Sequence, residues 1–336
     1  MLPISLMLAS DYKIRVRGVD QSLSGRPDAT ILIEIAVYAA VAAFLVLMLA
    51  GPPAWRRTTP LLFAAWGFAL TLAISASWSS QQALAMVRGL QLLVVCGLCQ
   101  AISKHATRDH LHWFGHGFVV VVAISVFLGV AFQLPRPQRL VSRFTWLYVH
   151  PVLAGTYLAL AVVLLIGYLT LRRRPGFGPA WPPWVYGSLL ALTAAALLAT
   201  RTRGAIGACA LGCLVLAMGF STPKRRVDLI VILLALGVLI AVLFGQQIVD
   251  FLQRGESTEQ ISTFNSRTAL WDIALDLFSQ RPLFGYGLTA SRGAFLDALA
   301  LGGAHNGFVN VLVDAGLVGA LWWLALLGLL ARTILR

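Results

Sequence analysis

A histidine and several arginines stand where the chain changes from polar to apolar, and these residue types could support acid–base or anion-binding chemistry. His305 and Asn306 lie in GGAHNGFVN, directly before an apolar stretch. A histidine titrates near neutral pH and could accept a proton from a hydroxyl group. The alternative is a packed or hydrogen-bonded residue at the membrane edge. The residues around this histidine therefore decide whether it is catalytic or structural.

Arginines occupy two short segments between apolar stretches. Arg201 and Arg203 lie in TRTRGA, and Arg143 belongs to a segment, 135–148, that holds three arginines and no acidic residue. The guanidinium fork grips phosphate oxygens through parallel hydrogen bonds. We therefore expect an anionic partner here, with phospholipid headgroups as the alternative.

The segment NSRTALWDIALDLFSQRPLFGYG predicts a short amphipathic helix that ends at a turn. Its apolar face consists of Leu270, Ile273, Ala274 and Leu277. Asn265 or Ser266 can cap its start, and Pro282 with two glycines ends it. Arg267 lies in the first turn, where a helix disfavours a cation, so a bound anion is one explanation and a solvated surface arginine is the other.

The composition of the chain indicates that membrane-spanning helices position these residues. The chain of 336 residues is 59% hydrophobic and 12% charged, and its mean hydropathy is +0.81. Soluble domains carry about twice that charged fraction, so we expect an all-α polytopic integral membrane protein. About nine transmembrane helices are expected, at 29–50, 60–77, 83–102, 113–134, 150–171, 184–200, 204–220, 227–247 and 307–331. Residues 1–336 would form a single membrane domain, with one long outer segment, 250–304, that contains short helices.

The loops predict the orientation. Basic residues concentrate in alternate loops, at Arg56–Arg57, Lys104 with Arg108, Arg172–Arg174 and Lys224–Arg226. The positive-inside rule places these loops in the cytoplasm and residues 250–304 outside, which means in the periplasm if the cell is Gram-negative and extracellular otherwise. The net charge of +13 is scattered over loops, which favours contacts with membrane lipids and argues against nucleic acid as a partner.

Polar residues inside the expected spans are few. Arg88 lies within the third span and is a functional candidate by default, although it could instead pair with Glu34 or Asp314. The four cysteines fall in apolar stretches and are interpreted as packing residues. The outer segment lacks a carboxylate or His/Cys cluster suited to a metal, so no metal and no cofactor is expected.

The order of these motifs resembles that of the O-antigen ligase and polymerase superfamily. The resemblance rests on Arg267 and Trp271, the turn PLFGYG, His305–Asn306 and GLVG at 316–319. Upstream, TRTRGA and VHPVLAGTY resemble two further family motifs. Three positions depart from the usual pattern: Thr202 replaces Ser, Ser266 replaces Gly, and Val152 replaces Asn.

The resemblance implies a metal-independent membrane glycosyltransferase. Its donor would be a glycan on undecaprenyl pyrophosphate, and its acceptor a second glycan or lipid A–core. His305 would act as the general base or orient the acceptor, while Arg203 and Arg267 would bind the pyrophosphate. The further substrate-binding candidates are Arg201, Arg88, Asn306 and Arg143. The site would face the periplasm from a bacterial inner (cytoplasmic) membrane.

Ligase and polymerase activities both remain open, and the opening SDYKIRVRG favours an exopolysaccharide polymerase. A transporter or flippase for the same lipid-linked sugar is a competing class, although internal repeats typical of transporters are not visible. The third class is a non-catalytic subunit that acts with other polysaccharide assembly proteins.

Overall fold

In the computed structural model, every regular element of the described residues is helical. The described residues are 2–12, 28–50, 59–132, 143–145, 151–172, 180–219, 239, 242–246, 249, 267–299 and 306–335. The chain divides into two compact units: unit 1 comprises 1–23 and 107–256, and unit 2 comprises 24–106 and 257–336. The expectation of a single domain over 1–336 stays a prediction.

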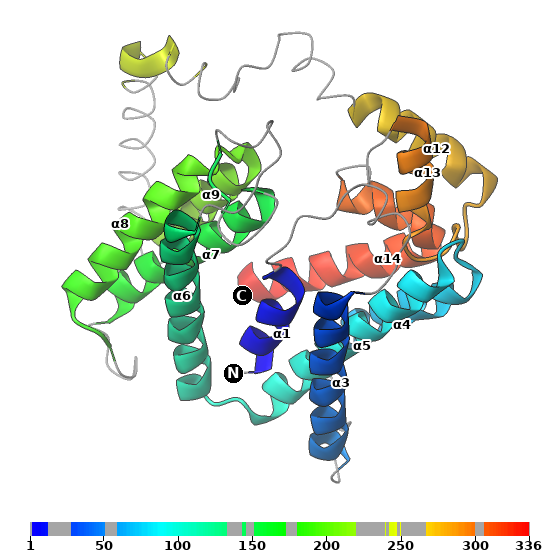
Figure 1. The fold of residues 1–336 in the computed structure, drawn as a ribbon, viewed down its shortest axis with the longest axis horizontal. Coiled ribbons are helices and arrows are strands. Elements are labelled where there is room, and N and C mark those ends of the chain that lie inside the picture. The colour runs from blue at the N-terminus through cyan, green and yellow to red at the C-terminus, as the bar shows by residue number, and fades with distance from the viewer. Residues whose placement is uncertain are drawn as a thin grey trace. The chain divides into compact units, whose positions relative to one another are not determined.

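Unit 1 is organised around one central helix. Its elements are α1 (Leu2–Asp11), α6 (Arg108–Ala131), α7 (Pro151–Leu171), α8 (Pro183–Ala199) and α9 (Arg203–Gly219). Helix α7 packs against α6, α8 and α9, seen as the green helices of Figure 1. Leu158 and Leu165 on α7 are fully buried, together with Val119 and Val122 on α6. This apolar core positions both ends of the short segment between α8 and α9.

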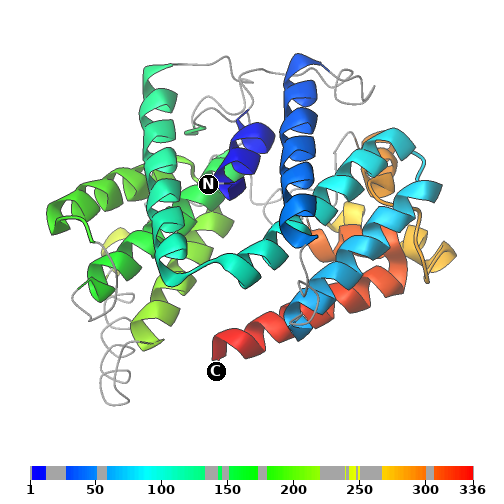
Figure 2. The ribbon, with the colours of Figure 1, turned by 90° about the horizontal axis from the view of Figure 1, so that it is seen from below.

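Unit 2 contains the other helices. They are α3 (Ala29–Leu49), α4 (Pro60–Ser75), η2 (Ala76–Trp78), α5 (Gln82–His105), α12 (Arg267–Gln280), α13 (Ala290–Leu299) and α14 (Gly307–Leu335). Helix α4 packs against both α5 and α14, and α3 packs against α5. Helices α12 and α13 pack on α14. Figure 2 shows α4 running alongside α14.

The helices confirm an all-α polytopic membrane protein. Six of them, α3, α4 with η2, α5, α6, α7 and α14, are long and apolar enough to cross a membrane. Helices α8 and α9 are apolar but have 17 residues each. The expected span at 227–247 lies largely outside the described residues. Helix α6 begins at Arg108, earlier than expected, because a capping box joins Thr107 and His110 at its start.

Candidate functional site

The segment between α8 and α9 places two arginines beside two buried threonines. We call residues 200–203 the arginine turn. Thr200 and Thr202 are 0% and 6% exposed, whereas Arg201 and Arg203 are partly exposed. The Thr200 hydroxyl donates to Leu197 O at 2.7 Å and accepts from Thr202 N at 3.2 Å. These bonds turn the two threonine hydroxyl groups inward.

Arg201 adopts a left-handed backbone conformation, with φ of +47°. Few residues other than glycine tolerate this region, and the conformation costs about 1–3 kcal/mol. Arg203 is the first residue of α9, where the free N–H groups carry partial positive charge. Two guanidinium groups and a helix N-terminus make the arginine turn electropositive, which suits a phosphate-type anion.

Arg143 braces the arginine turn from a segment 57 residues earlier in the chain. Its Nε donates to Thr200 O at 2.9 Å, and its Nη2 donates to the Thr202 hydroxyl at 3.1 Å. The next residue, Phe144, donates its N–H to Ala199 O at 2.9 Å. The arginine predicted to contact an anion or headgroup therefore makes contacts that support the backbone of the turn.

The segment VHPVLAGTY also meets the arginine turn. The Thr202 hydroxyl donates to Pro151 O at 3.2 Å. A Cβ atom on Gly155 would lie 3.1 Å from Thr202 Cβ and 3.0 Å from Ala205 Cβ, so α7 and α9 approach closely there. Two of the motifs that carry the resemblance are thus in direct contact. Val152 is exposed on α7, and His150 lies outside the described residues.

In unit 2, the turn after α12 is bonded to α14 through the backbone. Leu317 N donates to Pro282 O at 2.8 Å, and Tyr286 N donates to Val313 O at 2.9 Å. Helix α14 is interrupted at Gly316, with φ of +60° and ψ of −156°. We call residues 282–287 with 313–318 the glycine clamp. Gly285, Gly287 and Gly316 all have positive φ, which glycine adopts without strain.

Asp314 fixes the start of α13. Its carboxylate accepts from Thr289 N at 3.1 Å and from Ser291 N at 2.8 Å, and the residue is 8% exposed. Thr289 has φ of +67°, so the carboxylate also holds an uncommon backbone conformation. Sequence reasoning considered Asp314 only as a partner for Arg88. The signal available was an acidic residue in an apolar stretch, where a charge needs partners.

Two serines at the end of α4 hold the same region and were missed by sequence reasoning. Ser75 Oγ accepts from Leu288 N at 3.0 Å, and Ser79 Oγ donates to Leu288 O at 2.8 Å. Both serines are buried, at 0% and 4% exposed. They satisfy the two backbone groups of Leu288, which links α4 to the residues just after the glycine clamp.

The predicted catalytic residues of unit 2 are only partly described. Arg267 is the first residue of α12, as predicted, and its side chain lies outside the described residues, as does the whole of His305. Asn306 accepts the N–H of Phe308 at 3.0 Å, and its own carbonyl accepts Asn310 N at 3.0 Å. This pattern makes Asn306 the N-cap of α14.

Arg88 pairs with Glu34, one of the two partners considered. Arg88 Nη1 lies 3.2 Å from Glu34 Oε1 and donates to Gln91 Oε1 at 2.7 Å. Gln91 Nε2 donates to Glu34 Oε1 at 2.8 Å. Among the described residues, no group of three or more His, Cys, Asp or Glu could hold a metal ion.

Comparison with known proteins covers the C-terminal part of the chain. Residues 188–324 match the family model described as O-antigen ligase. This range includes Arg201, Arg203, Arg267, His305 and Asn306 but not Arg88 or Arg143. The chain is also 28% identical to an O-antigen ligase of Pseudomonas aeruginosa, over 235 residues that cover 62% of this chain and 55% of the relative. The match thus spans about half the relative's length, and no solved structure matches.

Proposed function

We propose that the chain, which is similar to the O-antigen ligase family over residues 188–324, transfers glycan from an undecaprenyl-pyrophosphate-linked oligosaccharide to an acceptor sugar. The arginine turn is the observation that carries the proposal. It holds two partly exposed arginine residues at a helix N-terminus, inside the matched region. A pyrophosphate leaving group needs that kind of positive environment.

The proposed reaction exchanges one carbon–oxygen bond for another. The acceptor hydroxyl oxygen attacks the anomeric carbon while the bond from that carbon to the pyrophosphate oxygen breaks. The hydroxyl proton passes to the His305 imidazole, and the lipid pyrophosphate leaves with the electron pair. Arg203 and Arg267 stabilise the charge that grows on the leaving oxygen, with Arg201 as a further contact.

Arg143 has a positioning role in this proposal. Its hydrogen bonds to Thr200 O and the Thr202 hydroxyl hold the backbone that carries Arg201 and Arg203. Asn306 has a similar role, since it caps the helix that begins directly after His305. Neither residue needs to touch the donor for its replacement to slow the reaction.

The charge of the loops supports a site on the periplasmic side of a bacterial inner membrane. Arginines can supply the positive charge that a metal ion supplies in other glycosyl transfers, so we propose metal-independent chemistry. The name of the curated relative favours ligase over polymerase, and the two activities differ only in the acceptor used.

The test uses purified protein in liposomes with an undecaprenyl-pyrophosphate oligosaccharide and EDTA, and products resolved on a gel. A ladder of longer glycans would identify a polymerase, and a single addition to lipid A–core would identify a ligase. His305→Ala should lower the rate by about 10²–10⁴-fold, the usual contribution of a general base. Arg203→Lys should lower it at least about tenfold, because a point charge cannot replace the bidentate grip.

Arg332→Lys, at the far end of α14, is the matched control and should keep wild-type activity. A rate in His305→Ala or Arg203→Lys equal to that of wild type would remove that residue from the mechanism. If wild-type protein forms no product with either acceptor, the transporter and assembly-subunit hypotheses replace the transferase.

A further inference from the structure

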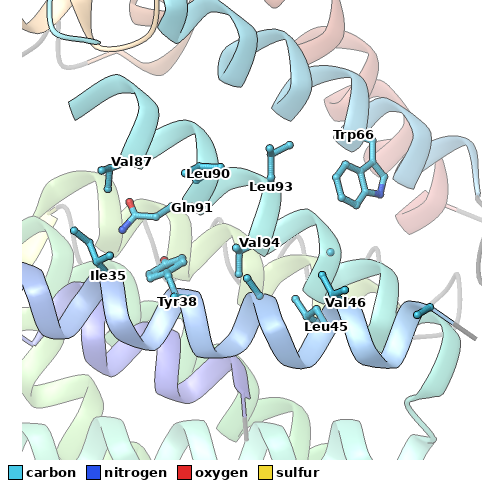
Figure 3. A pocket seen from close by; sticks show the side chains of 14 residues that line it. Ile35, Tyr38, Leu45, Val46, Trp66, Val87, Leu90, Gln91, Leu93 and Val94 are labelled. Atoms are coloured by element: carbon cyan, nitrogen blue, oxygen red, sulfur yellow. The ribbon is translucent and has the colours of Figure 1, made fainter. Parts of the chain in front are cut away.

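An apolar groove runs along unit 2 between α3 and α5. Its volume is about 590 Å³, and its lining includes Tyr38, Ala42, Leu45, Leu90, Val94 and Gly97. Figure 3 shows Gln91 and Tyr38 toward one end of this groove and Trp66 toward the other. Both helices are long and apolar enough to cross a membrane, so the medium that reaches the groove is lipid.

Gln91 lines the groove near one end, and Glu34 and Arg88, which are not part of the lining, are bonded to it from beside that end. Glu34 is buried at 3% exposed, whereas the Arg88 side chain is 44% exposed. The contacts of Arg88 with Glu34 and Gln91 both use Nη1. A guanidinium group has five N–H donors, so Nε and Nη2 remain available to an acceptor at this end of the groove.

The dimensions of the groove match one lipid chain. From Val87 to Gly97, α5 rises about 15 Å at 1.5 Å per residue, which is half of the ~30 Å hydrocarbon thickness of a bilayer. One acyl chain spans one leaflet, so the groove has about the length of one extended acyl chain.

We propose that this groove binds one acyl chain of a membrane phospholipid whose phosphodiester accepts hydrogen bonds from Arg88. Glu34 offsets the charge of Arg88, so the polar end suits a singly charged phosphodiester better than a pyrophosphate. A polyisoprenoid of 55 carbons would also be much longer than the groove. The phospholipid completes the contact between α3 and α5, and its binding does not depend on the transferase activity proposed above.

The test is native mass spectrometry of the full chain in detergent, titrated with phosphatidylglycerol. Ala42→Phe fills the groove, and Ala43→Phe adds the same ring at a neighbouring exposed position that does not line it. We expect Ala42→Phe to weaken phosphatidylglycerol binding at least tenfold and Ala43→Phe to leave it unchanged. Arg88→Gln should weaken phosphatidylglycerol at least fivefold while leaving binding of uncharged diacylglycerol unchanged. Equal retention of phosphatidylglycerol by Ala42→Phe, Ala43→Phe and wild type would overturn the proposal.

A second measurement needs no variant. Phosphatidylglycerol with a photoreactive group at the middle of one acyl chain should label wild-type protein in peptides from residues 35–50 and 87–97. Labelling spread evenly over all membrane-facing helices would overturn the proposal. So would stoichiometric displacement of the labelled lipid by undecaprenyl pyrophosphate, since that result would assign the groove to the lipid-linked donor.

Discussion

The arginine turn and the glycine clamp are both short irregular segments, yet they are held by different parts of the chain. In the arginine turn, side chains stabilise the backbone. Two buried threonine hydroxyl groups and the Arg143 guanidinium group form hydrogen bonds there. In the glycine clamp, backbone N–H groups of one segment donate to backbone carbonyls of the other. The first arrangement depends on side chains that supply these donors and acceptors together, whereas the second leaves no room for an added carbon at its glycines.

The largest effect is expected in the glycine clamp. A Cβ atom on Gly316 would lie 2.5 Å from both the carbonyl carbon and the oxygen of Leu283, at a φ of +60°. We expect Gly316→Ala to lower the free energy of unfolding by at least about 3 kcal/mol, from overpacking and backbone strain together. Thermal unfolding in detergent measures this. Gly328→Ala in the same helix, with nothing within 4 Å, is the control and should unfold at the wild-type temperature.

Asp314 beside the clamp should rank second. Asp314→Ala leaves the N–H groups of Thr289 and Ser291 without their acceptor, which costs about 2–4 kcal/mol of unfolding free energy. Asp314→Asn keeps one acceptor oxygen and should lose about half as much. The same thermal unfolding measurement applies, and equal midpoints for both variants and wild type would show that the carboxylate does not hold α13.

Arg143→Lys tests whether the arginine turn depends on its brace. Lysine keeps the positive charge but cannot bond Thr200 O and the Thr202 hydroxyl together, so we expect a loss of about 1–3 kcal/mol. The unfolding measurement is made without any lipid-linked donor. An Arg143 that served only to bind an anion would leave the unfolding temperature unchanged under these conditions.

The smallest effect is expected at Thr202. Thr202→Ser keeps the hydroxyl bonded to Pro151 O and Arg143 and removes one methyl group, so the loss should be about 0.8 kcal/mol or less. Thr202→Val keeps the shape and removes the hydroxyl, for which we expect about 1–2 kcal/mol. If valine is as stable as serine, the hydroxyl bonds do not hold the turn.

Local patterns predicted α12 and its end well. Leu270 and Ala274 are buried at 0% and 2% exposed, as their helical spacing predicted. The turn at Pro282 and the two following glycines were also predicted, because periodicity and turn chemistry depend on neighbouring residues only. The break of α14 at Gly316 was not predicted, since GLVG in an apolar stretch is compatible with a continuous helix until another segment bonds to its backbone.

The partners of polar residues in the membrane-spanning helices were also not predictable from local sequence patterns. The sequence left Glu34 and Asp314 open as partners of Arg88, and the structure pairs Arg88 with Glu34 while Asp314 accepts backbone N–H groups. Arg143 was expected to meet an anion or a headgroup, and the structure shows it bonded to the arginine turn. The roles of His305, Arg203 and Arg267 in catalysis stay predictions.

The sequence by itself determined that this protein is a helical membrane protein whose residues 188–324 are similar to the O-antigen ligase family, because apolar composition and motif order are properties of the chain alone. It also predicted which residues could contact an anion, since only arginine combines a permanent charge with a bidentate fork. Only the tertiary structure decided which arginine braces a turn, which one is neutralised by Glu34, and where α14 breaks. These features depend on contacts between residues that are 25 to 59 positions apart in the chain. No local sequence pattern encodes such contacts.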